Sequence, residues 1–488
     1  MQRGRPYQHI GVAQFYPWRP HVAQRDFLLR VAEEYGAQTS ELVCNGSFEK
    51  CYDKQYQTLG WGTIDHCVKC RLGGGRSRTA ARYFVLDWST RNIPVEGEEI
   101  AMLSNRAALV RAELREDITL SQSSEGLLHA YRVAFHSALR WIERFGIDLI
   151  LLFNGRIDLL KGVMDAARFA GVDFASYERS WFGNGIMLIP FENCLGLGLM
   201  HNLCRDRAGI PLSTEEANAA EKIIQRRVER IGSNEWRDFQ IQGKAWKNDV
   251  LSELGSTPEI LVLPSSMYEV WGHPDWQVDW RDNFEALESL QARLGVPWSR
   301  WVVRGHPIWH QRVGRSRGEA PIRRYHDFCL QRGIRFVASD SKLHTSALID
   351  ACDLVVLNGG SSIIDAVWKG KPVISLAQSV YREAGICPTL LGPSDPIDIP
   401  SDDERKEQLI RFIHTMGRIM PTFVNHLVSV SPAEQIQYEG ADFKEIVDQV
   451  QLRCLNTPSK NIAPVGAELR VAHKLVHRAR KLMRTGDR

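Results

Sequence analysis

Apolar and polar positions along this chain alternate between two patterns, short apolar runs and longer stretches with helical periodicity. Runs such as 147–153 and 259–263 have the length and composition of buried strands, whereas apolar residues in 124–145 recur every three or four positions. Strands that alternate with helices on this scale predict a parallel sheet covered by helices. Because the alternation occurs in both halves, we predict an α/β protein with two Rossmann-like lobes whose parallel sheets face a central cleft.

The first predicted lobe covers residues 1–250. A capping-box pattern, Ser213-x-x-Glu216, predicts the start of a charged helix that runs to Ile231. Residues 235–257 are polar and have no clear period, so we place the boundary between the lobes there. The other elements expected in this lobe are strands at 9–15, 40–44, 147–153 and 172–177, and helices at 22–35, at 124–145 and up to residue 170.

The second predicted lobe covers residues 255–430, and a helical tail, 431–488, follows it. Strands are expected at 259–263, 300–304, 334–337, 353–357 and from 373 onward, and helices at 283–294, at 322–333, up to 352 and from 362. The last stretch, 468–488, has apolar residues on one helical face and Lys and Arg largely on the other. This basic amphipathic helix either packs on the body of the protein or attaches to the cytoplasmic face of the inner membrane.

Composition and charge exclude few classes of function. The chain has 488 residues, 44% of them apolar, and a net charge of +3, which favours no polyanionic partner. No nucleic-acid motif is present, so we expect no nucleic-acid binding. No secretory signal pattern is present either, and Glu192 interrupts the most apolar region, 180–204. We therefore expect a cytoplasmic protein.

Four of the ten cysteines form a group, Cys44-x6-Cys51-x15-Cys67-x2-Cys70, within an irregular insertion at 44–80. In a reducing compartment such a group is a candidate metal site more often than a pair of disulfides. The sequence leaves two interpretations open: a structural zinc held by the four thiolates, or free and redox-active thiols.

Polar residues gather where the predicted strands end. Residues 358–362, Asn-Gly-Gly-Ser-Ser, follow an apolar strand and open a helix, so they offer backbone N–H groups and two hydroxyls to a phosphate. The alternative is an ordinary capped turn. The other loops that follow strands contribute Asn154, Arg156 and Glu178 in the first lobe, and Ser265, Ser266, Glu269, Arg304, His306 and Pro307 in the second.

These loops resemble those of the capsular polysaccharide biosynthesis proteins, which are GT-B glycosyltransferases similar to bacterial Kdo and sialic acid transferases. The resemblance covers about residues 145–390. It rests on Arg304-Gly-His-Pro307 and on the stretch 358–373, which contains the Gly-Gly-Ser-Ser loop, Asp365 and Gly370-Lys371-Pro372. It implies a GT-B-like fold and a nucleotide-sugar donor, with CMP-Kdo-like donors favoured. It also implies a glycan or lipid-linked glycan as acceptor, in capsular or surface polysaccharide biosynthesis.

The resemblance also implies roles for single residues. His306 and the serine pair would hold the donor phosphate, and with Arg304 they would neutralise it without a metal ion. An acidic loop of the first lobe would supply the catalytic carboxylate, and since this chain has Glu178-Arg-Ser where the family has two carboxylates and glycine, Glu178 is the residue left for it. The residues expected to bind the nucleotide are Ser265, Ser266, Glu269, Arg304, Pro307, Asn358, Gly360, Ser361, Ser362 and Asp365, with Asn154, Arg156 and Lys371 elsewhere in the cleft.

Alternatives remain at the level of both protein and residue. The same fold also suits a nucleotide-sugar epimerase or hydrolase, or a non-catalytic scaffold subunit of a polysaccharide assembly or export complex. Glu178 could instead form a structural ion pair with Arg156 or Arg179. A second His-Pro pair, at His273, is expected to pack or to line an acceptor site rather than to contact phosphate.

Overall fold

The computed structural model describes residues 7–18, 21–34, 36–46, 51–57, 67–68, 70, 82–87, 124–179, 186–229, 250, 254–265, 270, 273–310, 319–419, 424–427 and 437–440. Ser266, Glu269 and the predicted basic helix 468–488 lie outside these residues. Within them, no helix is long and apolar enough to cross a membrane.

The first lobe is built on a six-stranded sheet with the order β3-β2-β1-β4-β5-β6. Every neighbouring pair is parallel except β5 and β6, which are antiparallel. The order places β1 beside both β2 and β4, so the loops after β1 and β4 diverge at a topological switch point. The strands are β1 His9–Ala13, β2 Gln38–Val43, β3 Tyr83–Val85, β4 Leu149–Phe153, β5 Asp173–Arg179 and β6 Ile186–Pro190.

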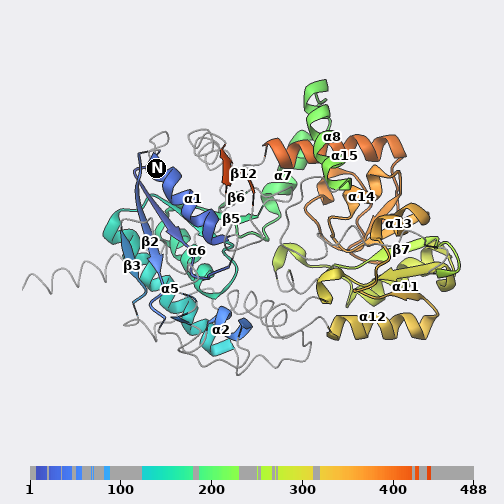
Figure 1. Ribbon diagram of the computed structural model, residues 1–488, viewed down its shortest axis with the longest axis horizontal. Helices are drawn as coiled ribbons and strands as arrows, with labels where there is room; N and C mark the ends of the chain where they lie inside the picture. The colour runs from blue at the N-terminus through green and yellow to red at the C-terminus, as the bar shows by residue number, and fades with distance from the viewer. Residues whose placement is uncertain are drawn as a thin grey trace, which may run out of the picture.

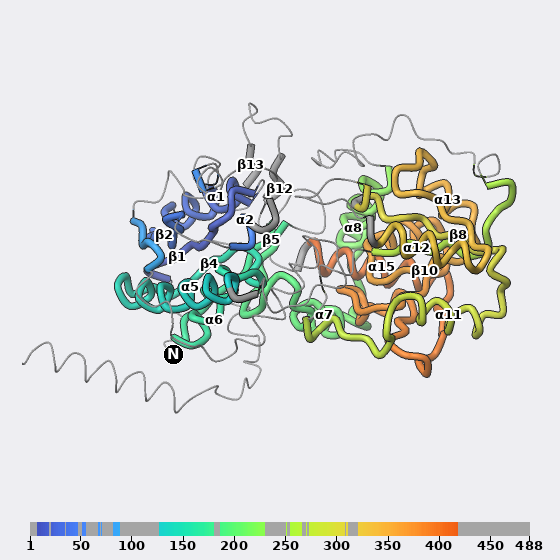
Figure 2. The backbone as a smooth tube through the Cα atoms, turned by 90° about the horizontal axis from the view of Figure 1, so that it is seen from below, coloured from blue at the N-terminus to red at the C-terminus, as the bar shows by residue number. Residues whose placement is uncertain are grey.

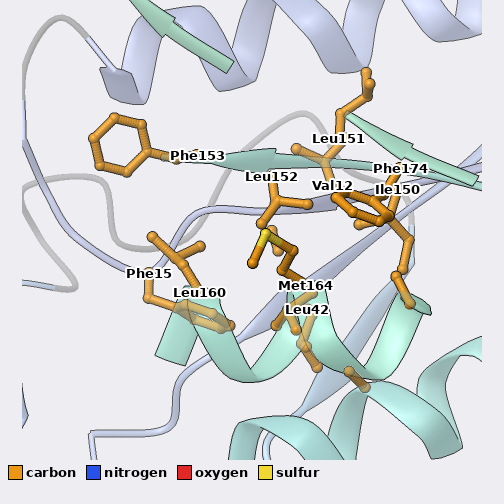
Figure 3. Close-up of a cluster of buried hydrophobic side chains, with 14 of the residues drawn as sticks. Val12, Phe15, Leu42, Ile150, Leu151, Leu152, Phe153, Leu160, Met164 and Phe174 are labelled. Atoms are coloured by element: carbon orange, nitrogen blue, oxygen red, sulfur yellow. The ribbon is translucent and has the colours of Figure 1, made fainter. Parts of the chain in front are cut away.

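Helices cover this sheet on both faces (Figure 1). They are α1 His21–Glu34, α2 Tyr52–Gln57, α5 Ser124–Phe145 and α6 Asp158–Ala170. Side chains from the strands and from α6, including Val12, Leu152 and Met164, form the buried cluster in Figure 3. Helices α5 and α6 approach so closely that a Cβ at Gly162 would lie 2.4 Å from the carbonyl oxygen of Tyr131, so this position requires glycine.

The second lobe has a five-stranded sheet with the order β11-β10-β7-β8-β9, all parallel. The chain runs outward from β7 to β9 and then returns to place β10 on the other side of β7, so the switch point lies between β7 and β10. The strands are β7 Ile260–Leu263, β8 Trp301–Arg304, β9 Arg335–Val337, β10 Leu354–Leu357 and β11 Val373–Ser375. The main helices are α11 Asn283–Leu294, α12 Glu319–Arg332, α13 Thr345–Ala351, α14 Ile363–Trp368 and α15 Asp402–His414.

Two helices that precede the predicted boundary near residue 250 pack against the second lobe. These are α7 Gly198–Arg207 and α8 Thr214–Val228, and Figure 2 shows α8 beside α15, away from the first sheet. Apolar residues of both helices, Met200 and Ile224 among them, share one buried cluster with Leu409 and Phe412 of α15. The chain therefore crosses between the lobes after β6.

Most predicted elements are confirmed, and the capping box at Ser213 and Glu216 is present. Several elements were not predicted: α2 and β3 in and after the irregular insertion, β6 and α7 in and just beyond the apolar region 180–204, and α15 and β12 Val424–Leu427 in the second half. In the predicted helical tail, β13 Gln437–Gly440 pairs antiparallel with β12, so the helical prediction is wrong at 437–440.

Candidate functional site

The loops that follow β7 and β10 are joined at the carboxyl edge of the second sheet. Asn358 directly follows β10 and is buried, and its Oδ1 accepts a hydrogen bond from the backbone N–H of Ser265, which follows β7. The two strands are neighbours in the sheet, which is why their loops meet. Asn358 and Ser265 were both predicted to belong to the nucleotide site.

The two glycines of this loop allow its backbone to pack tightly. Gly359 has φ of +87°, and a Cβ there would lie 2.6 Å from the carbonyl oxygen of Gln378. A Cβ at Gly360 would lie 2.8 Å from the hydroxyl oxygen of Ser265. Side chains at these positions would push the loop away from its neighbours, and only glycine adopts the positive φ without strain.

Arg227, in the last turn of α8, lies against the serine of this loop. Its Nη2 donates to the hydroxyl oxygen of Ser361 at 3.0 Å and to the carbonyl oxygen of the same residue at 3.1 Å. The same nitrogen forms an ion pair with Asp365 Oδ2 at 3.4 Å. The adjacent Ser362 is the N-cap of α14, but its side chain makes no capping hydrogen bond. The guanidinium group of Arg227 and the hydroxyls of Ser361 and Ser362 thus lie together at this loop.

Sequence analysis missed Arg227 because it lies 134 positions from Ser361. The charged helix that carries it was predicted, yet nothing in the local pattern separates Arg227 from its exposed neighbour Arg226. The contact depends on the packing of α8 against the second lobe.

The structure places the side chain of Arg304 against the loop that follows β9. Its guanidinium is buried and donates to the carbonyl oxygens of Ala338 and Ser341, the latter at 3.0 Å. Burial lowers its pKa to about 10, against the opposing effect of Asp340. With these donors directed at the loop after β9, Arg304 holds that loop in place. Its neighbour His306 is half-buried, and its ring centroid lies 6.1 Å from that of Trp309, the last residue of the turn that Pro307 opens.

Lys371 was also predicted to line the cleft, and the structure places it elsewhere. Its Nζ donates to the carbonyl oxygen of Asp350 at 2.9 Å, next to the end of α13. Lys371 precedes β11, whereas the Gly-Gly-Ser-Ser loop follows β10, and these strands are parallel. Lys371 therefore lies at the amino edge of the sheet, opposite to the proposed phosphate loop.

Glu178 lies near the carboxyl end of β5 in the first lobe, as predicted. Asn154, which follows the neighbouring strand β4, donates from Nδ2 to Glu178 Oε2 at 3.0 Å. The backbone N–H of Arg179 donates to Oε1, also at 3.0 Å, and the Nε2 atom of His21 lies 3.6 Å from the same oxygen. The Glu178 side chain retains 24% of its exposure, so it is held in place and still accessible. The neighbouring His21, a residue the sequence did not identify, forms an ion pair with Glu178 only when its ring is protonated.

Asp158 is the first residue of α6, and its carboxyl group is fully buried beneath the loop after β1. It accepts hydrogen bonds from the hydroxyl of Tyr16 and from the backbone N–H of Tyr52, the latter at 2.9 Å. Burial raises its pKa to about 6, although both hydrogen bonds act in the opposite direction. Asp158 thus joins α6 to the start of α2.

The predicted zinc site has no structural support. The described residues include Cys44, Cys51, Cys67 and Cys70, and among them no group of three or more His, Cys, Asp or Glu side chains could hold a metal ion. Burial raises the pKa of the Cys51 thiol well above its usual value. Zinc binding stays a prediction, to be checked by elemental analysis.

A short bridge connects the two carboxyl edges. The side chain of Asn193 lies 3.2 Å from Nε2 of His273, and the indole N–H of Trp276 donates to the carbonyl oxygen of Leu195 at 2.7 Å. Trp276 also packs beside Gly359, and the N–H of Cys194 donates to the carbonyl oxygen of Asn154 at 2.8 Å. Burial lowers the pKa of His273 to about 4, so this histidine is neutral. Residues 193–197 therefore link the Glu178 region to the Gly-Gly-Ser-Ser loop.

No family model matches the chain, and no curated protein matches it. Among solved structures, it is similar to two Thermosulfurimonas dismutans KpsC transferases. The beta Kdo 2,7 transferase is 12% identical with a TM-score of 0.38, over 64% of this chain and 88% of that one. The beta Kdo 2,4 transferase is 14% identical with a TM-score of 0.37, over 62% and 88%.

The chain is also similar to a Methanocaldococcus jannaschii UDP-GlcNAc 2-epimerase, solved in complex with UDP-GlcNAc and UDP. The identity is 12% and the TM-score 0.29, over 91% of this chain and 98% of that one. At such scores and identities the likeness carries no argument about activity. The two-lobe Rossmann-like fold rests on the strand order of the two sheets, and the function on the residues at their carboxyl edges.

Proposed function

We propose that this protein is a glycosyltransferase that binds a nucleotide sugar and transfers the sugar to a glycan acceptor in capsular or surface polysaccharide biosynthesis. The observation that carries the proposal is the contact of Arg227 with Ser361 and Asp365 at the carboxyl edge of the second sheet. It places a cation and two hydroxyls on a glycine loop at the switch point of a parallel sheet, where such folds bind ligands.

A nucleotide phosphate fits this group of residues chemically. A guanidinium can donate two parallel hydrogen bonds to phosphate oxygens, and it keeps its charge at every physiological pH. Asp365 now pairs with Arg227, so an incoming phosphate would replace the carboxylate on the guanidinium. The released Asp365 carboxylate would then be available to the ribose hydroxyls.

Arg227 takes the role that the sequence suggested for Arg304. When the bond between sugar and phosphate breaks, negative charge grows on the leaving phosphate, and a preorganised cation lowers the energy of that state. In this proposal, transfer uses Arg227, His306 and the serine hydroxyls for that purpose. Glu178, held by Asn154 on the first sheet, is the carboxylate of the acceptor side.

The donor is proposed to be CMP-Kdo-like, with a glycan or lipid-linked glycan as acceptor. A nucleotide-sugar epimerase or hydrolase is the second candidate, because a nucleotide held at this loop would serve either of those reactions as well as transfer.

One assay separates these functions. Purified protein is incubated with CMP-Kdo, CMP-sialic acid or UDP-GlcNAc, with and without a Kdo- or GlcNAc-terminated oligosaccharide, and free nucleotide is measured. Nucleotide release that requires the oligosaccharide supports transfer. Release without acceptor supports hydrolysis, an altered sugar on intact nucleotide supports epimerisation, and absence of any binding supports the scaffold alternative.

A further inference from the structure

His21 faces Glu178 across the carboxyl edge of the first sheet. It is the first residue of α1, which follows β1. In the sheet, β4 lies between β1 and β5, the strand that carries Glu178. Nε2 of its ring lies 3.6 Å from Oε1 of Glu178, and the centroid of the ring lies 4.2 Å from the centroid of the Phe153 ring. Its side chain is 14% exposed, so it is held by packing and still reaches the surface beside Glu178.

The other ring nitrogen of His21 contacts a buried amide. Nδ1 lies 3.0 Å from Oε1 of Gln24, one turn further along α1, and Gln24 is fully buried. An amide oxygen can only accept, so the tautomer with its proton on Nδ1 donates to Gln24. In that neutral tautomer Nε2 has a lone pair beside Glu178. The contact with Gln24 therefore favours the tautomer that can act as a base at Nε2.

The spacing between His21 and Glu178 leaves room for a third group. A distance of 3.6 Å between nitrogen and carboxylate oxygen exceeds a hydrogen bond, so a hydroxyl oxygen could approach both atoms from the open side. When Nε2 takes a proton from that hydroxyl, the ring becomes positive beside a carboxylate, which stabilises it. Asn154 and the backbone N–H of Arg179 keep Glu178 in this position.

We infer that His21 is a catalytic residue that removes the proton from the acceptor hydroxyl, with Glu178 stabilising the imidazolium that forms. This inference rests on the proposed function. In the step, the acceptor O–H bond breaks and its proton passes to Nε2 of His21. The acceptor oxygen forms a bond to the anomeric carbon, and the bond between that carbon and the donor phosphate breaks. The electron pair of that bond leaves with the nucleotide.

The test compares His21→Gln and His21→Ala with wild type. Glutamine keeps a polar side chain but cannot take the proton, so transfer should fall by ~10²–10⁴-fold. Calorimetry with CMP and UDP should show affinities within about threefold of wild type, since the nucleotide is held by the second lobe. Added imidazole should restore part of the rate of His21→Ala, and the fall in wild-type rate at acidic pH should be absent from His21→Gln. The control is His326→Gln, at an exposed position on α12.

The outcomes separate this inference from the proposed function. If wild type transfers sugar and His21→Gln does so at a similar rate, His21 is not the base and the proposed function stands. A slow His21→Ala that imidazole does not rescue, with an unchanged pH profile, indicates a structural role and also overturns the inference. If wild type releases no nucleotide with any donor and acceptor, both proposals fail.

Discussion

Arg227→Ala should weaken nucleotide binding while leaving the fold intact. The variant removes the guanidinium that contacts Ser361 and Asp365. A hydrogen bond to a charged group contributes about 1.5–3 kcal/mol, so we expect the dissociation constants of CMP and UDP to rise by about 10- to 150-fold. Arg227→Lys keeps a charge but loses the planar pair of donors, and it should recover only part of the affinity.

The effect of Arg227→Ala on stability should be small. The side chains of Arg227 and Asp365 are 30% and 27% exposed, and ion pairs near the surface contribute about 0–1 kcal/mol. The free energy of unfolding, measured with urea, should therefore change by no more than about 1 kcal/mol. A much larger loss would mean that Arg227 serves mainly to hold α8 against the second lobe.

Isothermal titration calorimetry with CMP, UDP and inorganic pyrophosphate is the assay. Arg226→Ala is the matched control, because Arg226 is the preceding residue on α8 and is exposed. Pyrophosphate has no ribose, so Asp365→Asn should bind it more tightly than wild type if carboxylate and phosphate compete for the guanidinium. Equal affinities of wild type, Arg226→Ala and Arg227→Ala for all three ligands would refute the assignment of the phosphate site.

Three further predictions concern the other residues of the site and the buried carboxyl group. Glu178→Gln should leave donor binding within about threefold of wild type and reduce transfer by ~10²–10⁴-fold; a near wild-type transfer rate would contradict its catalytic role. The double variant Ser361→Ala with Ser362→Ala should raise the dissociation constants of CMP and UDP by about tenfold or more in calorimetry, since each lost hydrogen bond to a charged group contributes ~1.5–3 kcal/mol; unchanged affinity would remove this loop from the site. In the folded protein the pKa of Asp158 is raised from 3.8 to about 6. Its protonated carboxyl group therefore stabilises the fold fully below pH 3.8, and this stabilisation is lost as the pH rises through about 6. Relative to Asp158→Asn, the free energy of unfolding of wild type should therefore fall by about 3 kcal/mol across that range in urea titrations, and parallel pH profiles would show that Asp158 does not titrate there.

Local sequence determined the elements of this protein and the loops that carry its chemistry. The apolar run before Asn358 predicts the strand that the structure contains, and the serine and glutamate at 213 and 216 cap a helix through contacts three positions apart. A loop that follows a strand lies at the carboxyl edge of its sheet, which is why the sequence alone assigns Asn154, Glu178 and Ser361 to such edges. The prediction that Lys371 lines the cleft did not follow this rule, because Lys371 precedes β11 and therefore lies at the amino edge.

Which of these groups meet depends on how the strands and helices pack together. Glu178 contacts His21 because the sheet order brings β1 beside β4 and β4 beside β5, although the two residues are far apart in the chain. Arg227 reaches Ser361 because the apolar face of α8 is buried against the second lobe rather than the first. Hydrogen bonds within a helix or a turn depend on neighbouring residues, whereas strand order and helix packing depend on how the whole apolar surface is buried, and no single segment encodes that.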